Sequence, residues 1–147
     1  MGLSSVMQIG LSGLAAAELT LDTVANNLAN LNTAGYKQSF PRFATQTPAT
    51  HSLGEPSSGS SGGVNAVQIG RGVQAAEVAV DSSPGALVTT AGTDGLSSGD
   101  STRELSNTDL GENLVQMLLA GNQFRASRQV IGTASKLLED LVELRRR

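Results

Sequence analysis

The sequence predicts a mainly α-helical protein in which long N- and C-terminal helices pair as a coiled coil, with a small β-hairpin and flexible Ser/Gly-rich loops between them. Three observations predict this fold. Apolar residues recur at helical spacing near both ends of the 147-residue chain. Parts of the stretch between them alternate with the period of a β-strand. The rest of that stretch is rich in Ser, Gly, Pro and Thr.

The first helix is predicted over residues 3–31, where apolar residues are spaced alternately three and four apart. On a helix of about 3.6 residues per turn they fall in one stripe, which must be buried against another apolar helix. Asn32 and Gly35 follow, and Gly35 suits the left-handed conformation that ends a helix. The residues of this stripe are Leu14, Ala17, Leu21, Val24, Leu28 and Leu31.

A second long helix is predicted over residues 106–147. Ser106 and Asn107 are favourable N-cap residues, and Asp109 and Glu112 place negative charge near the N-terminus, where the helix dipole favours it. This helix also has an apolar stripe at spacings of three and four, interrupted by Arg128. The stripe consists of Leu110, Leu114, Met117, Gly121, Phe124, Ile131, Ala134, Leu138 and Leu141.

The middle segment, residues 36–105, is predicted to contain a small β-hairpin. Residues 73–80 and 86–90 alternate with period two, and the Pro-Gly pair within residues 81–85 indicates a turn between them. We therefore expect these two strands to pair with each other.

Aromatic residues gather just after the first helix, and we expect them to pack its end onto the middle segment. They are Tyr36, Phe40 and Phe43, together with Pro41. Residues 46–65 and 91–105 are dominated by small and polar residues, which predicts flexible loops. The chain thus divides into an N-terminal helix (1–35), the middle segment (36–105) and a C-terminal helix (106–147).

Composition and charge exclude several classes of function. The net charge of −3 and the pI near 5.0 argue against a nucleic-acid-binding protein, which would show a basic stripe. The absence of cysteine excludes a disulfide scaffold and thiol catalysis. His51 is the single histidine and stands in a predicted loop without other metal-ligating residues around it. We therefore expect no metal and no cofactor.

Residues 70–75 read GRGVQA, which fits the GxGxxA fingerprint of dinucleotide-binding proteins. The context does not fit, because the following residues predict a strand where the fingerprint needs a helix N-terminus to hold a pyrophosphate. The sequence also has no P-loop, GxSxG or HExxH motif. We therefore expect no enzyme, no small-molecule substrate, and no catalytic, cofactor-binding or metal-ligating residues.

Glycines inside both predicted helices indicate that these helices are marginal on their own. Each of Gly10, Gly13, Gly111, Gly121 and Gly132 costs on the order of 1 kcal/mol relative to alanine. The first half of the N-terminal helix is also apolar nearly all round, which is typical of a helix with several neighbours. We expect both helices to order fully only in an assembly. The alternative is that the middle segment of the same chain covers the first helix.

The N-terminal sequence does not resemble a secretory signal. The first cationic side chain is Lys37, and the uncharged residues 1–17 are too few and too polar to span a bilayer. If the chain leaves the cytoplasm, we expect it to do so without a recognisable cleaved signal.

Both ends of the chain resemble the signatures of bacterial flagellar rod and hook axial proteins. Residues 11–37 are similar to that family's apolar helix followed by NNxAN and N-T-x-G-[YF]-[KR]. The matching residues are Asn26, Asn27, Ala29, Asn30, Asn32, Thr33, Gly35, Tyr36 and Lys37. Ser106, Asn107 and Asp109 open a C-terminal segment similar to the family's SNVDL helix, and residues 70–92 resemble the short β segment of distal-rod and hook members.

The resemblance implies a structural subunit of the flagellar rod that polymerises helically, with its terminal helices paired as an inner coiled coil around a central channel. It implies copies of itself and other flagellar axial proteins as partners, and a place in the periplasm-spanning rod of the basal body. It also implies export through the flagellar type III apparatus without a cleaved signal peptide. We expect the assembly interface to combine the first stripe with Leu114, Met117, Phe124, Ile131, Leu138 and Leu141.

The position within the rod stays open on the sequence. The chain lacks the large outer domain inserted in hook and distal-rod relatives, so it has the size of a proximal-rod subunit, whereas its β segment is closer to the distal kind. The alternative function is an amphipathic coiled-coil adaptor or a peripheral membrane-binding protein. The predicted N-terminal helix, however, offers no Lys or Arg to anionic lipid.

Overall fold

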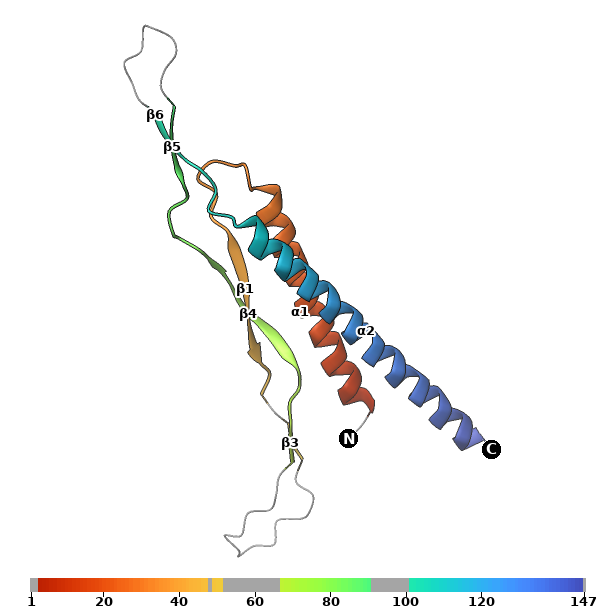
Figure 1. Ribbon diagram of the computed structural model, residues 1–147. Helices are drawn as coiled ribbons and strands as arrows, with labels where there is room; N and C mark the ends of the chain where they lie inside the picture. Colours follow the sequence, from red (N-terminus) through yellow and green to blue (C-terminus); the bar gives the residue numbers. More distant parts are fainter. Residues whose placement is uncertain (1–2, 48, 52–66, 91–100, 147) are drawn as a thin grey trace, which may run out of the picture.

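The computed structural model describes residues 3–47, 49–51, 67–90 and 101–146. This part of the chain has two long helices and six short strands, which confirms a mainly helical protein with small antiparallel β-structure (Figure 1). The elements in chain order are α1 (Leu3–Ala29), β1 (Ser39–Thr45), β2 (Ala49–His51), β3 (Val67–Ile69), β4 (Val73–Val80), β5 (Leu87–Thr90), β6 (Ser101–Glu104) and α2 (Leu110–Arg146).

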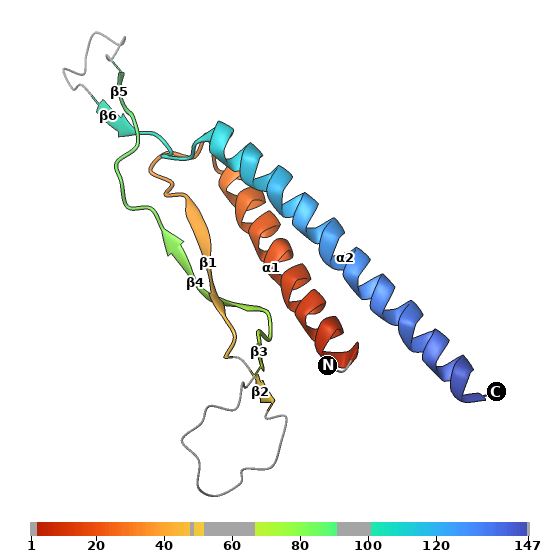
Figure 2. The same ribbon diagram turned by 60° about the horizontal axis from the view of Figure 1, so that its bottom comes forward.

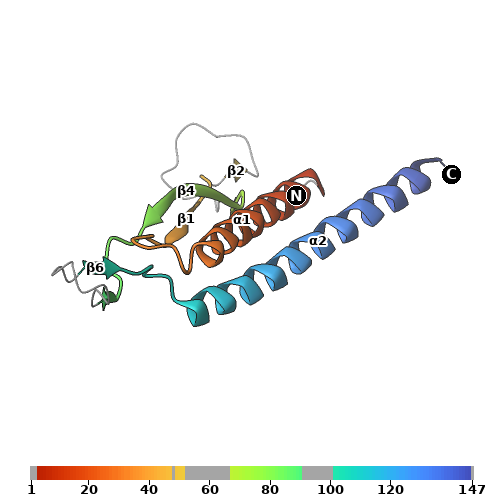
Figure 3. The ribbon, with the colours of Figure 1, turned by 90° about the horizontal axis from the view of Figure 1, so that it is seen from above.

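The two helices lie side by side and antiparallel, so the start of α1 and the end of α2 are on the same side of the molecule (Figures 1 and 2). α2 begins beside the end of α1 and continues past its start, because α2 has 37 residues and α1 has 27. Seen from above, α1 lies between α2 and the β1–β4 sheet (Figure 3). Both the second helix and this sheet therefore pack on α1.

Small residues form the contact between the two helices. The buried apolar residues of the described chain are Ala16, Ala17, Val24, Ala120 and Ala134. A Cβ atom at Gly10 would lie 2.8 Å from Cγ1 of Ile131. A Cβ atom at Gly13 would lie 2.8 Å from Oγ of Ser127. The glycines of α1 therefore permit a close approach of the two backbones, and the buried core between the helices is thin.

α1 ends at Ala29 and not at residue 31 as predicted. The side-chain amide of Asn30 donates to the carbonyl of Asn26 (3.0 Å), and side-chain bonds of this kind compete with continuation of a helix. A series of turns follows. Gly35 has a φ of +67°, which confirms the predicted left-handed conformation, but it lies beyond the helix and closes the last of these turns.

The predicted hairpin between residues 73–80 and 86–90 is wrong. Both stretches are strands, but β4 pairs antiparallel with β1, and β5 pairs antiparallel with β6. Of the aromatic cluster that was expected to pack the end of the first helix onto the middle segment, Phe40 and Phe43 lie in β1 with Pro41; Phe40 and Pro41 are half-buried and Phe43 is exposed. A period-two pattern identifies a strand but not its partner, and the local pairing across the turn is not the one that the chain adopts.

The β1–β4 ladder runs from Ser39 opposite Val80 to Thr45 opposite Val73, with a bulge between Arg42 and Phe43. An isolated two-stranded ribbon is marginally stable in water. Packing on α1 therefore supplies part of the stability of this sheet (Figure 3).

Two stretches predicted as loops contain strands. β2 lies within residues 46–65 and pairs antiparallel with β3, so the backbone of His51 belongs to a strand. β6 lies within residues 91–105 and pairs with β5. Most of the remaining residues of these predicted loops, 52–66 and 91–100, lie outside the described residues.

The N-cap of α2 is Asp109, not the predicted pair at 106–107. Oδ1 of Asp109 accepts hydrogen bonds from the backbone N–H groups of Gly111 (2.7 Å) and Glu112 (3.1 Å). These bonds satisfy two of the N–H groups that the first turn leaves without a helical partner. α2 accordingly begins at Leu110.

Candidate assembly site

The buried side-chain amide of Asn27 joins α1 to β1 and α2. Its Nδ2 donates to the carbonyl of Ser39 (2.8 Å) and to Oδ1 of Asn113 (3.0 Å). Its Oδ1 accepts from the backbone N–H of Ser39 (2.9 Å) and from the hydroxyl of Tyr36 (3.0 Å). Asn27 is 0% exposed, so these bonds replace the water that burial removes.

Asn113 and Gln38 continue this network on the side of α2. Nδ2 of Asn113 donates to the carbonyl of Asp109 (2.7 Å) and to Oε1 of Gln38 (3.3 Å). Both side chains are buried, and Oε1 of Gln38 also accepts from the N–H of Asp109 (3.4 Å). The segment before β1 is thereby attached to the first turn of α2.

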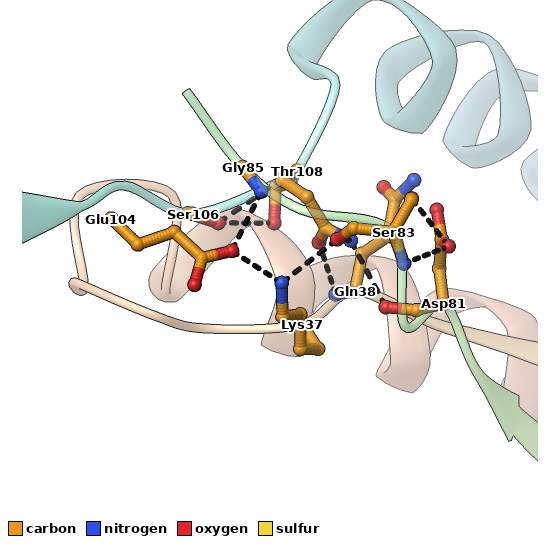
Figure 4. Close-up of polar contacts among 9 residues, drawn as sticks. Lys37, Gln38, Asp81, Ser83, Gly85, Glu104, Ser106 and Thr108 are labelled. Atoms are coloured by element: carbon orange, nitrogen blue, oxygen red, sulfur yellow. Dashed lines mark hydrogen bonds and ion pairs between the residues drawn. The ribbon is translucent and has the colours of Figure 1, made fainter. Parts of the chain in front are cut away.

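An ion pair closes the exposed side of the same corner (Figure 4). Nζ of Lys37 lies 2.5 Å from Oε1 of Glu104 and also donates to the carbonyl of Ser83 (2.8 Å). The N–H of Gly85 donates to the same Oε1 (2.8 Å). The bond from Lys37, with a smaller contribution from Gly85, holds the pKa of Glu104 below its ordinary value of 4.5.

Asn107 links three segments and does not cap a helix. Its Oδ1 accepts from the N–H of Gln38 (2.7 Å), and its Nδ2 donates to the carbonyls of Asp81 and Ser83 (3.0 Å each). The hydroxyl and N–H of Ser83 bond to the Asp81 carboxylate, which lowers the pKa of Asp81 below its ordinary 3.8. Ser106, the other predicted cap, donates instead to the hydroxyl of Thr108 (2.8 Å; Figure 4).

The remaining asparagines of the N-terminal motif lie nearer the surface. Oδ1 of Asn26 accepts from the hydroxyl of Tyr36 (2.8 Å), and Asn26 also bonds to Asn30. Asn32 is exposed. The motif therefore has a buried half, centred on Asn27, and an exposed half. The sequence alone did not identify Gln38 or Asn113 as parts of this corner.

Gly72, the second glycine of the GRGVQA stretch, lies where the sheet attaches to α1. Gly72 has a φ of +100°, and a Cβ atom there would lie 2.0 Å from Oγ of Ser12. The hydroxyl of Ser12 accepts from the N–H of Val73 (3.2 Å) and donates to the carbonyl of Ile9 (2.8 Å). The close approach of the two backbones therefore explains why residue 72 is glycine, and no phosphate-binding role is needed to explain it.

The predicted apolar stripe of α1 is partly covered in the single chain. Ala17 and Val24 are buried. Leu14, Leu21, Leu28 and Leu31 are half-buried.

The predicted stripe of α2 differs from its buried line. Leu114, Met117, Leu138 and Leu141 are exposed, whereas Phe124 and Ile131 are half-buried. The buried positions of α2 are Asn113, Ala120 and Ala134. Small side chains allow the helices to approach, and the larger residues next to them are placed at the flanks. Small and polar residues recur every seven positions along this buried line, from Asn113 through Ala120 and Ser127 to Ala134. This spacing could have identified the line from the sequence, but the more prominent pattern of large apolar residues was followed instead.

Large apolar side chains cover much of the outer surface of α2. Leu118 is 64% exposed and Leu144 is 72% exposed. The other exposed apolar residues of α2 include Leu110, Leu114, Val115, Met117, Leu119, Val130, Leu137, Leu138, Leu141 and Val142. Extended apolar surfaces of this kind mark sites of interaction with other molecules. Within the described residues, neither helix combines the length and apolarity that a membrane span requires.

Sequence comparisons agree with this arrangement. Residues 7–37, which cover most of α1 and the turns after it, match the family described as "Flagella basal body rod protein". Over its whole length the chain is similar to the flagellar basal-body rod protein FlgC of Borreliella burgdorferi, with 30% identity and 98% of each chain covered. The chain belongs to the flagellar rod and hook protein family.

Other members of the rod and hook family match over shorter stretches. The flagellar basal-body rod protein FlgG of Bacillus subtilis is 38% identical over 43% of this chain and 24% of its own length. The flagellar hook protein FlgE of Helicobacter mustelae is 40% identical over 44% of this chain and 14% of its own length. The chain therefore spans under a quarter of these two relatives.

Membership of the rod and hook family establishes a flagellar axial subunit of the basal body, which assembles with other flagellar axial proteins. The chain is a structural protein and not an enzyme, as the failed GxGxxA context predicts.

Proposed function

We propose that the chain is a subunit of the flagellar rod that self-assembles helically through its terminal helices, which pair as a coiled coil in the assembled rod. The exposed apolar surface of α2 carries this proposal. Large aliphatic side chains lie outside in the single chain while alanines lie inside. Covering these side chains with neighbouring subunits would remove them from water and stabilise the assembly.

Similarity along the whole chain favours a place in the rod. The chain covers 98% of the length of a rod protein but 14% of the length of a hook protein.

The three predicted regions take different parts in this proposal. The helices of residues 1–35 and 106–147 form the inner contacts with further copies, and the segment of residues 36–105 lies on their outer side. The assembly interface includes the residues predicted from the two stripes. The chain reaches the rod through the flagellar type III export apparatus without a cleaved signal peptide.

Assembly of the purified full chain tests the proposal. We expect sedimentation and electron microscopy to show filaments or tubes as the concentration rises. Leu118→Asp places a charge on the exposed apolar surface and should prevent assembly. Asn122→Asp adds the same charge at an exposed polar position of α2 and should interfere much less.

Two results would contradict the proposal. Assembly of Leu118→Asp at the concentration of the unmodified chain would show that this surface is not the contact. Flotation of the chain with anionic liposomes, without self-assembly under any condition, would instead favour the peripheral membrane-binding alternative.

A further inference from the structure

The contact between α1 and α2 contains one fully buried pair of polar side chains. Asn27 and Asn113 are each 0% exposed, and their side-chain amides share a hydrogen bond of 3.0 Å. Two bonds to the backbone of Ser39 orient Asn27, and bonds to Asp109 and Gln38 orient Asn113. The pair is therefore held in position from both helices.

The small residues that α2 places in this contact recur every seven positions, so they distinguish poorly between registers that differ by one heptad. On α2, Ala120, Ser127 and Ala134 follow Asn113 at a constant spacing of seven residues. In the observed register Gly13 lies opposite Ser127. A shift by one heptad would place Gly13 opposite Ala134, which is also small. Steric fit at Gly13 therefore permits both arrangements.

The lengths of the helices leave room for such a shift. α2 has 37 residues and α1 has 27, so α1 can move by one heptad, about 10 Å, toward the end of α2 and remain on it. The shift would place Asn27 opposite Ala120 and separate it from Asn113. Asn27 would then be buried against Ala120 without its partner amide, which is strongly unfavourable, and Asn113, now beyond the end of α1, would lose its bond to Asn27.

We propose that the Asn27–Asn113 amide pair determines the register of α1 on α2. A single buried polar pair sets register in paired helices because every shifted arrangement leaves its polar groups without partners. In the observed register the end of α2 is uncovered, with Leu141, Val142 and Leu144 exposed. A contact between this uncovered end and a neighbouring subunit depends on the proposed function. The register itself does not.

Paired cysteines can report the register because the chain has no cysteine of its own. A Cβ atom at position 13 would lie 3.8 Å from Cβ of Ser127, which is the usual separation in a disulfide. Gly13→Cys with Ser127→Cys therefore reports the observed register. Gly13→Cys with Ala134→Cys reports the register shifted by one heptad.

The measurement is the equilibrium constant for disulfide formation with glutathione in the purified full chain. This constant gives the effective concentration of the two thiols, even if the helices separate part of the time. We expect the 13–127 constant to exceed the 13–134 constant by at least tenfold. Introducing Asn113→Ala and Ala120→Asn together moves the partner amide by one heptad without changing the composition. We expect this exchange to shift the ratio at least tenfold toward 13–134.

Asn122→Leu, which removes an exposed asparagine from α2, serves as the control and should leave the ratio unchanged. An unchanged ratio after the exchange would overturn the proposal. So would an equal fall of both constants to the values of the urea-unfolded chain, because the amide pair would then be required for pairing in general and not for its register. All these measurements use single chains in solution, so a failure of assembly would not affect them.

Discussion

Nζ of Lys37 and Oε1 of Glu104 lie 2.5 Å apart, although the two residues are 67 positions apart in the chain. Lys37 precedes β1, Glu104 ends β6, and their other partners, Ser83 and Gly85, belong to the connection between β4 and β5. One ion pair therefore fixes the point at which the middle segment meets the end of α1 and the start of α2.

We expect the corner around Glu104 to weaken in acid. The pKa of Glu104 is lowered in the folded chain, so the unfolded chain binds more protons as the pH falls below about 4.5. The stabilisation is thus complete above the unfolded pKa and is lost as the pH falls through the lower folded pKa. The protection factor of the Gly85 amide, whose N–H bonds to Glu104, should fall over this range.

Two variants test the origin of that pH dependence. Glu104→Gln should abolish most of the change in the Gly85 protection factor between pH 6 and pH 3. Glu77→Gln removes a carboxylate from an ion pair with Arg42 whose side chains are 70% and 63% exposed, and it should leave Gly85 unaffected. Equal pH dependence in Glu104→Gln and the unmodified chain would refute the assignment.

Replacing Asn27 by Ala should destabilise the chain by about 2 kcal/mol or more. The substitution leaves the amide of Asn113 and the backbone of Ser39 buried with missing partners, and each such loss costs roughly 1–3 kcal/mol. Urea unfolding followed by circular dichroism measures the change. Asn32→Ala, at an exposed position of the same motif, should change stability by less than about 0.5 kcal/mol. Equal effects would mean that burial does not set the importance of these asparagines.

Gly72→Ala should loosen the β1–β4 sheet from α1. The left-handed φ of Gly72 strains an alanine by about 1–3 kcal/mol, and the added Cβ would also collide with Ser12. Amide exchange of Val73, which donates to Ser12, should increase strongly. A Cβ atom at Gly70 would have no neighbouring atom within 4 Å, so Gly70→Ala is the matched control and should retain the exchange rate.

Asp109→Ala should cost about 1 kcal/mol and shorten α2 at its start, because Asp109 caps the helix. Helical circular dichroism and urea unfolding measure the effect. Ser106→Ala should cause a smaller loss of helix, since Ser106 lies before the first turn and bonds to Thr108. A larger loss of helix in Ser106→Ala than in Asp109→Ala would show that the helix starts at residue 106, as predicted from the sequence alone.

The two helices could be predicted from sequence because their apolar spacing is a local property. The start of α2 was misplaced because Ser106, Asn107 and Asp109 are all good capping residues, and only the tertiary bonds of Asn107 decide between them. The pairing of β1 with β4 brings together strands far apart in the chain, and no local pattern encodes that partner.

The asparagine motif was recognised, but its division into buried and exposed halves was not. Asn26 and Asn27 are neighbours of the same type, and their burial depends on where β1 and Asn113 lie. The buried line of α2 was missed for a related reason. The prediction placed Leu114 at the contact, whereas its neighbour Asn113 occupies it.

The alanines and glycines between α1 and α2 change how this chain should tolerate substitution. In most proteins, buried positions tolerate only hydrophobic side chains, whereas exposed positions tolerate most substitutions. At the buried positions Ala17, Ala120 and Ala134 the selecting property should be side-chain volume, so that small residues would be accepted and leucine rejected. On the exposed apolar surface of α2, hydrophobicity should matter more than exact shape, so that any aliphatic residue of similar size would be tolerated. A charged residue there should impair assembly with neighbouring subunits but not the folding of the single chain.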